Sequence, residues 1–186
     1  MSGDLIDAAR AAGWPISDDV ARETRRAAGA ADQPIGKEAL DAEIAAFNRR
    51  AEAAAKAAGR SVKGSNRDLE DLMQIDVIRW ADSMVGQWPE LAYLYHAANG
   101  GKRSKGVAGK LKAMGVRRGV LDLFLPSPRG VYHGAYWELK VTGGRILKEQ
   151  AAFILFIERQ GYYVKVIYDD PELVKADILK YLRRAR

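Results

Sequence analysis

The sequence Gly119-Val120-Leu121-Asp122-Leu123-Phe124-Leu125 decides the fold together with Trp137-Glu138-Leu139-Lys140. Each is an apolar run typical of a buried β-strand, and charged side chains interrupt both runs. The segment between them contains Pro126-Ser127-Pro128-Arg129-Gly130, whose residue types favour a turn. The pattern therefore predicts an antiparallel pair of strands that places Asp122 beside Glu138. Charged side chains are rare inside strands unless they have partners, so this pair is the first candidate for a functional site.

Three charged side chains of this predicted pair suit phosphodiester hydrolysis. Glu138 and Lys140 are two residues apart, so they lie on the same face of their strand. Asp122 and Glu138 can together bind Mg²⁺ or Mn²⁺, and the backbone carbonyl of Leu139 is available as a further ligand. Lys140 can orient the attacking water or stabilise negative charge that develops on the phosphate. The alternative to a catalytic site is a simple salt bridge between Glu138 and Lys140 on a half-exposed strand. The spacing of these residues alone does not distinguish the two.

The net charge of +6 is unevenly distributed along the chain. Residues 1–65 carry equal numbers of acidic and basic side chains, so the whole excess lies in residues 66–186. No acidic residue occurs between Glu90 and Asp122, and such a cationic interval is typical of a protein that binds a polyanion. A solvated basic loop is the alternative, but the position directly before Asp122 favours phosphate binding. The basic residues of the interval are Lys102, Arg103, Lys105, Lys110, Lys112, Arg117 and Arg118.

Helical and strand patterns alternate in the rest of the chain, which predicts an α/β fold with a mixed β-sheet core flanked by helices. Residues 1–65 are rich in Ala and Arg and predict an α-helical N-terminal extension, with one long helix over 37–58. Residues 66–186 form the predicted main domain. Its expected helices begin at Asn66 or Asp68, at Lys105, at Lys148 and at Asp170-Pro171, and its expected strands span 91–96, 120–125, 135–141 and 162–168.

The composition excludes several kinds of site. The chain has 186 residues and no cysteine, which rules out disulfides, thiolate zinc sites and a cysteine nucleophile. The N-terminus lacks a basic-then-apolar signal pattern, and no apolar run approaches the length of a membrane span. We therefore expect a soluble intracellular protein, located in the cytoplasm, or in the host cytoplasm if the protein is viral, with no membrane partner.

An ordered set of motifs between about Glu70 and Asp170 resembles the VRR-Nuc family, a branch of the PD-(D/E)XK nuclease superfamily. The set covers somewhat over half of the chain and leaves residues 1–65 outside it. One departure is visible, because Leu121 precedes Asp122 where the superfamily usually has proline. The matching stretches are Leu94-Tyr95-His96, Asn99-Gly100-Gly101-Lys102-Arg103, Leu111-Lys112-Ala113-Met114-Gly115-Val116, Gly119-Val120-Leu121-Asp122-Leu123, Trp137-Glu138-Leu139-Lys140, Gly143-Gly144-Arg145, Glu149-Gln150 and Gly161-Tyr162-Tyr163-Val164.

The resemblance implies a metal-dependent nuclease with a restriction-endonuclease-like fold. It implies that Asp122 and Glu138 are metal ligands and that Lys140 is the catalytic lysine. It further implies a glutamate from the first helix of the domain near the metal, most simply Glu70, although Asp71 is only one residue away. Gln150 matches the glutamine of the family and is expected to contact water or phosphate at the site.

Two hypotheses from different classes follow. The first is a structure-selective DNA endonuclease that uses one or two Mg²⁺ ions, cuts branched DNA such as Holliday junctions in DNA repair, and acts as a homodimer of phage or bacterial type. The second is a nucleic-acid-binding or interaction protein whose nuclease fold no longer cuts. The complete set of Asp122, Glu138 and Lys140 favours the enzyme. The residues expected to contact DNA phosphates are Lys102, Arg103, Lys105, Arg117, Arg118 and Arg145.

Overall fold

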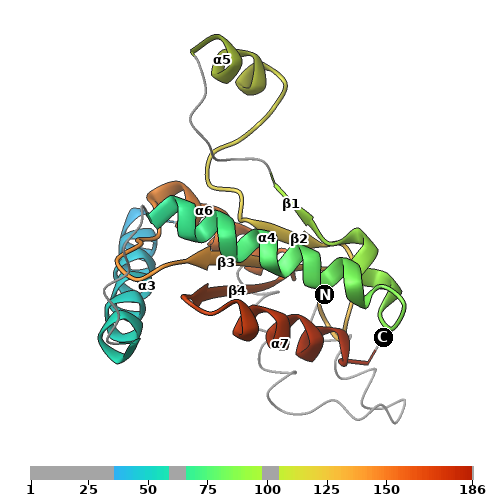
Figure 1. Ribbon diagram of the computed structural model, residues 1–186. Helices are drawn as coiled ribbons and strands as arrows, with labels where there is room; N and C mark the ends of the chain where they lie inside the picture. Colours follow the sequence, from blue (N-terminus) through green and yellow to red (C-terminus); the bar gives the residue numbers. More distant parts are fainter. Residues whose placement is uncertain (1–35, 59–65, 98–104, 186) are drawn as a thin grey trace, which may run out of the picture.

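The computed structural model describes residues 36–58, 66–97 and 105–185 (Figure 1). These residues form a four-stranded sheet with helices on both faces, which confirms the predicted α/β class. The elements in chain order are α3 (Lys37–Ala58), α4 (Asn66–Met84), the 3₁₀ helix η1 (Pro89–Tyr93), β1 (Tyr95–His96), α5 (Lys105–Ala113), β2 (Leu123–Leu125), β3 (Ala135–Lys140), α6 (Lys148–Arg159), β4 (Tyr163–Tyr168) and α7 (Pro171–Leu182).

The sheet has the strand order β1-β2-β3-β4. β2 pairs with both β1 and β3 in antiparallel orientation, whereas β3 and β4 are parallel and are joined through α6. In the β2–β3 ladder Leu123 pairs with Trp137. One further step along this register places Asp122 opposite Glu138, so the predicted strand pairing is confirmed.

Side chains that alternate along the strands build a separate hydrophobic cluster on each face of the sheet. Trp137 and its neighbours on one face pack with Val77 of α4 and Val174 of α7. These two helices lie side by side across that face (Figure 1). On the opposite face, Tyr136 packs against a cluster that includes Ile154 of α6. The sheet is therefore an interior layer, and its polar side chains are buried unless they lie near an end or an edge.

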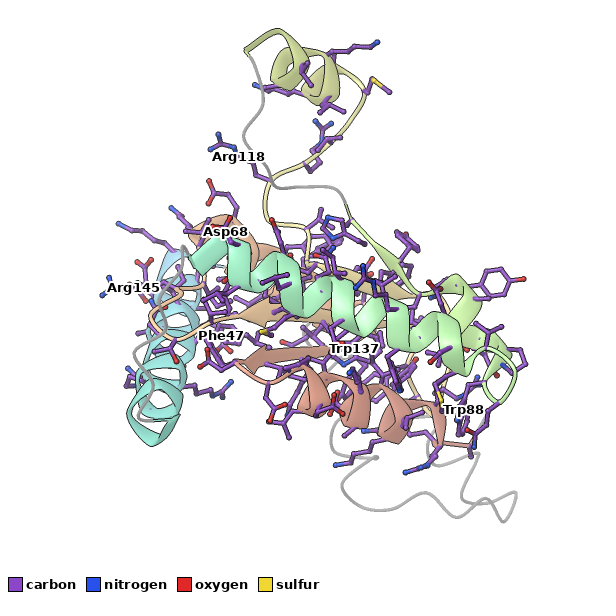
Figure 2. The ribbon with its side chains drawn as sticks, in the orientation of Figure 1. Phe47, Asp68, Trp88, Arg118, Trp137 and Arg145 are labelled. Carbon is purple, nitrogen blue, oxygen red and sulfur yellow. The ribbon has the colours of Figure 1, made fainter. Side chains whose placement is uncertain are left out.

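Helix α3 confirms the predicted helix over residues 37–58. It packs against α6, and its buried side chains Leu40 and Phe47 belong to the same hydrophobic cluster as Leu121 and Ile154. The phenylalanine lies between α3 and the body of the protein in Figure 2. The domain boundary at residue 65 stays a prediction, and residues 1–35 of the expected extension lie outside the described residues.

The strand predicted over residues 91–96 is wrong for most of its length. Residues 89–93 form η1, and only Tyr95 and His96 join the sheet as β1. Pro89 stands at the beginning of η1, where its fixed φ favours a helical turn and its missing N–H costs no helical hydrogen bond. Leu91 and Leu94 of this segment are both buried, Leu91 within the 3₁₀ helix and Leu94 directly after it.

The connection between β1 and β2 carries the basic helix α5 away from the sheet (Figure 1). On its return, the chain passes close to the first turn of α6. Gly119 has a positive φ of 85°, and a β-carbon at this position would collide with the backbone of Glu149. The predicted strand over 120–125 begins in the sheet only at Leu123.

Candidate active site

Asp122, Glu138 and Lys140 converge at one end of the β2–β3 pair, as the sequence predicted. Oδ2 of Asp122 accepts a hydrogen bond of 2.9 Å from the backbone N–H of Leu139, which joins the aspartate to the neighbouring strand. Glu138 has no solvent-exposed surface, and Lys140 is only 8% exposed. Nζ of Lys140 lies 2.5 Å from Oε1 of Glu138. The two charged groups of β3 thus form a buried ion pair rather than the half-exposed salt bridge of the alternative.

Glu70 of α4 joins these three residues from the adjacent helix. Its Oε1 lies 3.9 Å from Nζ of Lys140. Asp71 is exposed on the surface of α4. Of the two acidic residues that the sequence left open, the structure brings Glu70 to the site and leaves Asp71 in solvent.

Gln150 in the first turn of α6 connects the helix to the buried glutamate. Its Nε2 donates a short hydrogen bond to Oε1 of Glu138, and its Oε1 accepts one of 3.0 Å from the backbone N–H of Leu147. The second hydrogen bond satisfies a free amide at the beginning of α6, where helices leave N–H groups without partners. Gln150 therefore holds Glu138 and caps α6 at the same time.

The carboxylates of the site are electrostatically disfavoured as anions. Burial, together with the nearby negative charge of Asp122, raises the pKa of Glu138 to about 8, although Lys140 opposes both effects. Burial also raises the pKa of Asp122, against the hydrogen bond from Leu139, and the pKa of Glu70, against the charge of Lys140. Burial alone would lower the pKa of Lys140, but the surrounding carboxylates, Glu138 foremost, together outweigh this effect and raise the pKa.

Three carboxylates and one ammonium group leave an excess of negative charge at the site, which suits a divalent cation. Oε2 of Glu138 is buried and has no hydrogen-bond partner among the described residues, so this oxygen is available to a ligand. Carboxylate oxygens are the ligands that Mg²⁺ and Mn²⁺ prefer. Within the described ranges, however, no three His, Asp or Glu side chains are arranged as a complete metal site. The donor set fits such a cation only if backbone or water oxygens complete the coordination.

Comparison with known proteins places this site in a recognisable fold. The chain matches no family model and no curated protein. Its structure is similar to a solved structure of a "VRR_NUC domain protein", with a TM-score of 0.52 and 28% sequence identity over 67% of this chain and 93% of the other. The chain has a VRR-Nuc-like fold. This similarity supports a nuclease and agrees with the predicted restriction-endonuclease-like core.

The predicted DNA contacts lie on two separate parts of the VRR-Nuc-like fold (Figure 2). Arg117 and Arg118 are exposed on the segment that returns from α5 to β2, and Arg145 is exposed on the turn after β3. Lys105 begins α5, and nothing further is described of its side chain. The predicted contacts Lys102 and Arg103 lie outside the described residues. Within the described ranges, no helix is both long and apolar enough to cross a membrane.

A clamp that the sequence did not indicate holds the end of β3. Asp169 is the one non-glycine residue of the described chain with a positive φ, at 57°. Its backbone N–H donates to the carbonyl of Lys140 at 2.9 Å. Its carboxylate accepts two hydrogen bonds from Thr142, one of 2.6 Å from the backbone N–H and a short one from the hydroxyl. A left-handed backbone at a residue with three such bonds marks a position fixed by its surroundings.

The turn that follows Thr142 lies directly against the charged side chains of Glu70 and Lys140. The backbone N–H of Gly144 donates to the carbonyl of Val141 at 2.7 Å. A β-carbon on Gly144 would stand 2.8 Å from that carbonyl and 3.3 Å from both Oε1 of Glu70 and Cδ of Lys140. A glycine here lets the turn approach the two charged side chains closely. In the sequence, the Gly143-Gly144 pair was the one signal for this part of the site.

Proposed function

We propose that this chain is a metal-dependent, structure-selective DNA endonuclease. The observation that carries the proposal is the buried convergence of Asp122, Glu138 and Lys140 from two paired strands of a VRR-Nuc-like fold. A buried ion pair is weak support for stability, because desolvation offsets much of its attraction. Together with an oxygen of Glu138 that lacks a partner in the described chain, this arrangement is better explained by a ligand-binding role.

Asp122 and Glu138 would hold Mg²⁺ or Mn²⁺, with Glu70 and the backbone carbonyl of Leu139 as further oxygen donors. When bound, such an ion polarises the scissile phosphate and lowers the pKa of a coordinated water. Lys140 carries its positive charge beside this group of oxygens and would stabilise negative charge that develops on the phosphate. Gln150 keeps Glu138 in place through its side-chain amide.

Exposed cations on the described part of the connection between β1 and β2 (residues 105–122), called the arm from here on, support binding to the DNA backbone. Arg117 and Arg118 lie on the part of the arm that leads directly into Asp122, and Lys110 and Lys112 are exposed on α5. Arg145 is a further exposed cation, on the turn after β3. A homodimer would present two such sites to the two strands of a branched DNA, in keeping with two-fold symmetry.

Cleavage of defined DNA substrates tests the proposal. Purified protein would be incubated with a four-way junction, a flap and a blunt duplex, each in Mg²⁺ and in EDTA. We expect Mg²⁺-dependent cutting of the branched substrates and none in EDTA. Glu138→Ala should abolish cutting and leave DNA binding largely intact. Binding without cleavage of any substrate by the wild-type protein would instead support the inactive, nucleic-acid-binding alternative.

A further inference from the structure

A row of aromatic rings crosses the sheet beside the carboxylates. Tyr95 of β1 pairs with Phe124 of β2, which in turn pairs with Tyr136 of β3. Cross-strand partners share a face of the sheet, and residues two apart in a strand also share one. Phe124 and Tyr136 therefore lie on the same face as Glu138, the neighbour of Asp122 across the two strands. Positions two residues apart in a strand are separated by about 6.6 Å. Phe124 and Tyr136 are therefore the next side chains along that face from the carboxylates.

The rings are packed so that the outermost one is both fixed and accessible. The ring of Phe124 stacks on Tyr136 at a centroid distance of 4.2 Å and an interplanar angle of 25°. Tyr95 meets Phe124 edge to face, at 5.6 Å and 85°. Tyr95 nevertheless remains 51% exposed. Its partners hold the ring from one side, which reduces the entropy that a ligand must remove when it stacks on the open side.

Tyr95 lies beyond the carboxylates, on the side away from Arg117 and Arg118. β1 is an edge strand of the sheet, and the connection that carries α5 follows it in the sequence. The next residue, His96, contacts the backbone carbonyl of Asp122 through its Nδ1 at 2.9 Å. The chain enters Asp122 from Arg117 and Arg118, and Tyr95 pairs with Phe124, two residues beyond Asp122. A DNA strand that runs from the two arginines across the carboxylates and continues in the same direction would therefore reach the half-exposed ring. Cationic grooves combined with aromatic rings are the common means of binding single-stranded nucleic acid.

We propose that Tyr95, supported by Phe124, stacks on an unpaired base of the DNA strand whose phosphate lies at Asp122 and Glu138. This inference rests on the proposed function and narrows its substrate class to DNA with an unpaired or extruded nucleotide beside the cut site. A base inside a continuous duplex is stacked on its neighbours and is not free to contact the ring. Branch points and flaps contain unpaired bases, whereas in a blunt duplex a base must first be unstacked and unpaired, which costs free energy.

Binding measured in EDTA tests this inference separately from cleavage. The probe is a duplex with a single-stranded overhang that carries 2-aminopurine, and the comparison is a blunt duplex of matched length. For the overhang substrate we expect Tyr95→Ala to raise Kd by about tenfold and to abolish the fluorescence quenching that stacking causes. Its affinity for the blunt duplex should stay within about twofold of wild type. Tyr95→Phe and Tyr95→Trp should restore binding to the overhang, because each retains an aromatic ring.

Tyr93 provides a matched control. It is 69% exposed, lies two residues before Tyr95 on η1, and lines a different hollow of about 550 Å³ together with Pro126 and Pro128. Tyr93→Ala should leave both affinities unchanged. The inference is overturned if Tyr95→Ala binds the overhang as wild type does, weakens both substrates equally, or behaves as Tyr93→Ala does. A wild-type protein that binds and quenches the overhang but never cuts would contradict the nuclease and leave the stacking site standing.

Discussion

Oε1 of Glu138 lies 2.5 Å from Nζ of Lys140, whereas Oε2 of the same carboxylate is buried and has no hydrogen-bond partner among the described residues. One oxygen is thus paired with a positive charge, and the other retains the full cost of its removal from water. Protonation relieves that cost, which is why burial raises the pKa of this group to about 8. The site holds a carboxyl group that changes charge close to neutral pH.

The first prediction concerns the pH dependence of stability without metal. Glu138 binds its proton more tightly in the folded protein than in the unfolded chain, whose pKa is the ordinary 4.5. The stabilising contribution is complete below pH 4.5 and is lost as the pH rises towards 8. Urea unfolding in EDTA should show a free energy of unfolding that falls by about 1–4 kcal/mol over this range. Glu138→Gln should reduce the decline. An equally steep decline in this variant would show that other groups cause it.

The second prediction separates two adjacent acidic residues of α4. Glu70→Ala should lower kcat by about 100-fold, because it removes the carboxylate nearest to Lys140 after Glu138. Asp71→Ala should change kcat by less than about threefold, since the side chain of Asp71 is exposed. Thermal unfolding with and without Mg²⁺ gives a second measurement. The upward shift in Tm that Mg²⁺ binding produces should shrink in Glu70→Ala and persist in Asp71→Ala. Equal effects of the two substitutions would remove Glu70 from the site.

The local sequence pattern was sufficient to predict the strand pairing at the centre of the site, but not the structure around it. Asp122 and Glu138 could be paired from sequence because two short strands and one turn determine their register. The prediction failed at residues 91–96, where a proline and one buried leucine produced a 3₁₀ helix with the same apolar composition as a strand.

Other parts of the site depend on contacts between distant segments. Asp169 meets Thr142 across 27 residues, and the ring of Tyr95 meets Phe124 only because β1 pairs with β2 in one register. Asp169 belongs to no local motif, and although Tyr95 lies in a stretch that matches the family, its place beside Phe124 depends on the fold. Gln150 was expected from the resemblance at the site, but its hydrogen bond to Glu138 became visible only in the structure.

The third prediction concerns the arm between β1 and β2. Arg117→Ala combined with Arg118→Ala should weaken DNA binding and reduce the slope of log Kd against log salt concentration by about 2, because each phosphate contact contributes about 0.9 to that slope. The effect should be similar for all DNA sequences, since backbone contacts carry no sequence information. Arg159→Ala on the last turn of α6 is the control for loss of a positive charge. A salt slope identical to that of wild type would show that the arm does not contact phosphate.

The fourth prediction tests the clamp between Asp169 and Thr142 as a device that positions Lys140 and Glu70. Thr142→Val removes the hydroxyl donor, and Asp169→Gly retains the left-handed backbone but removes both acceptors. Each should lower kcat by about tenfold, because the turn at Gly144 would no longer hold the charged side chains in place. KM should stay near the wild-type value, since neither side chain belongs to the arm that is proposed to bind DNA.

Conservative variants and a double mutant complete this test. Thr142→Ser retains the hydroxyl, and Asp169→Asn retains one acceptor and tolerates the backbone conformation, so both should recover most of the activity. The double mutant Thr142→Val with Asp169→Gly should lose little more than either single variant, because the two residues act through the same hydrogen bonds. Urea unfolding would establish that all variants are folded at the assay temperature. Additive losses in kcat, or equal losses in Thr142→Ser and Thr142→Val, would mean that the two residues affect the reaction separately and that the clamp does not position Lys140.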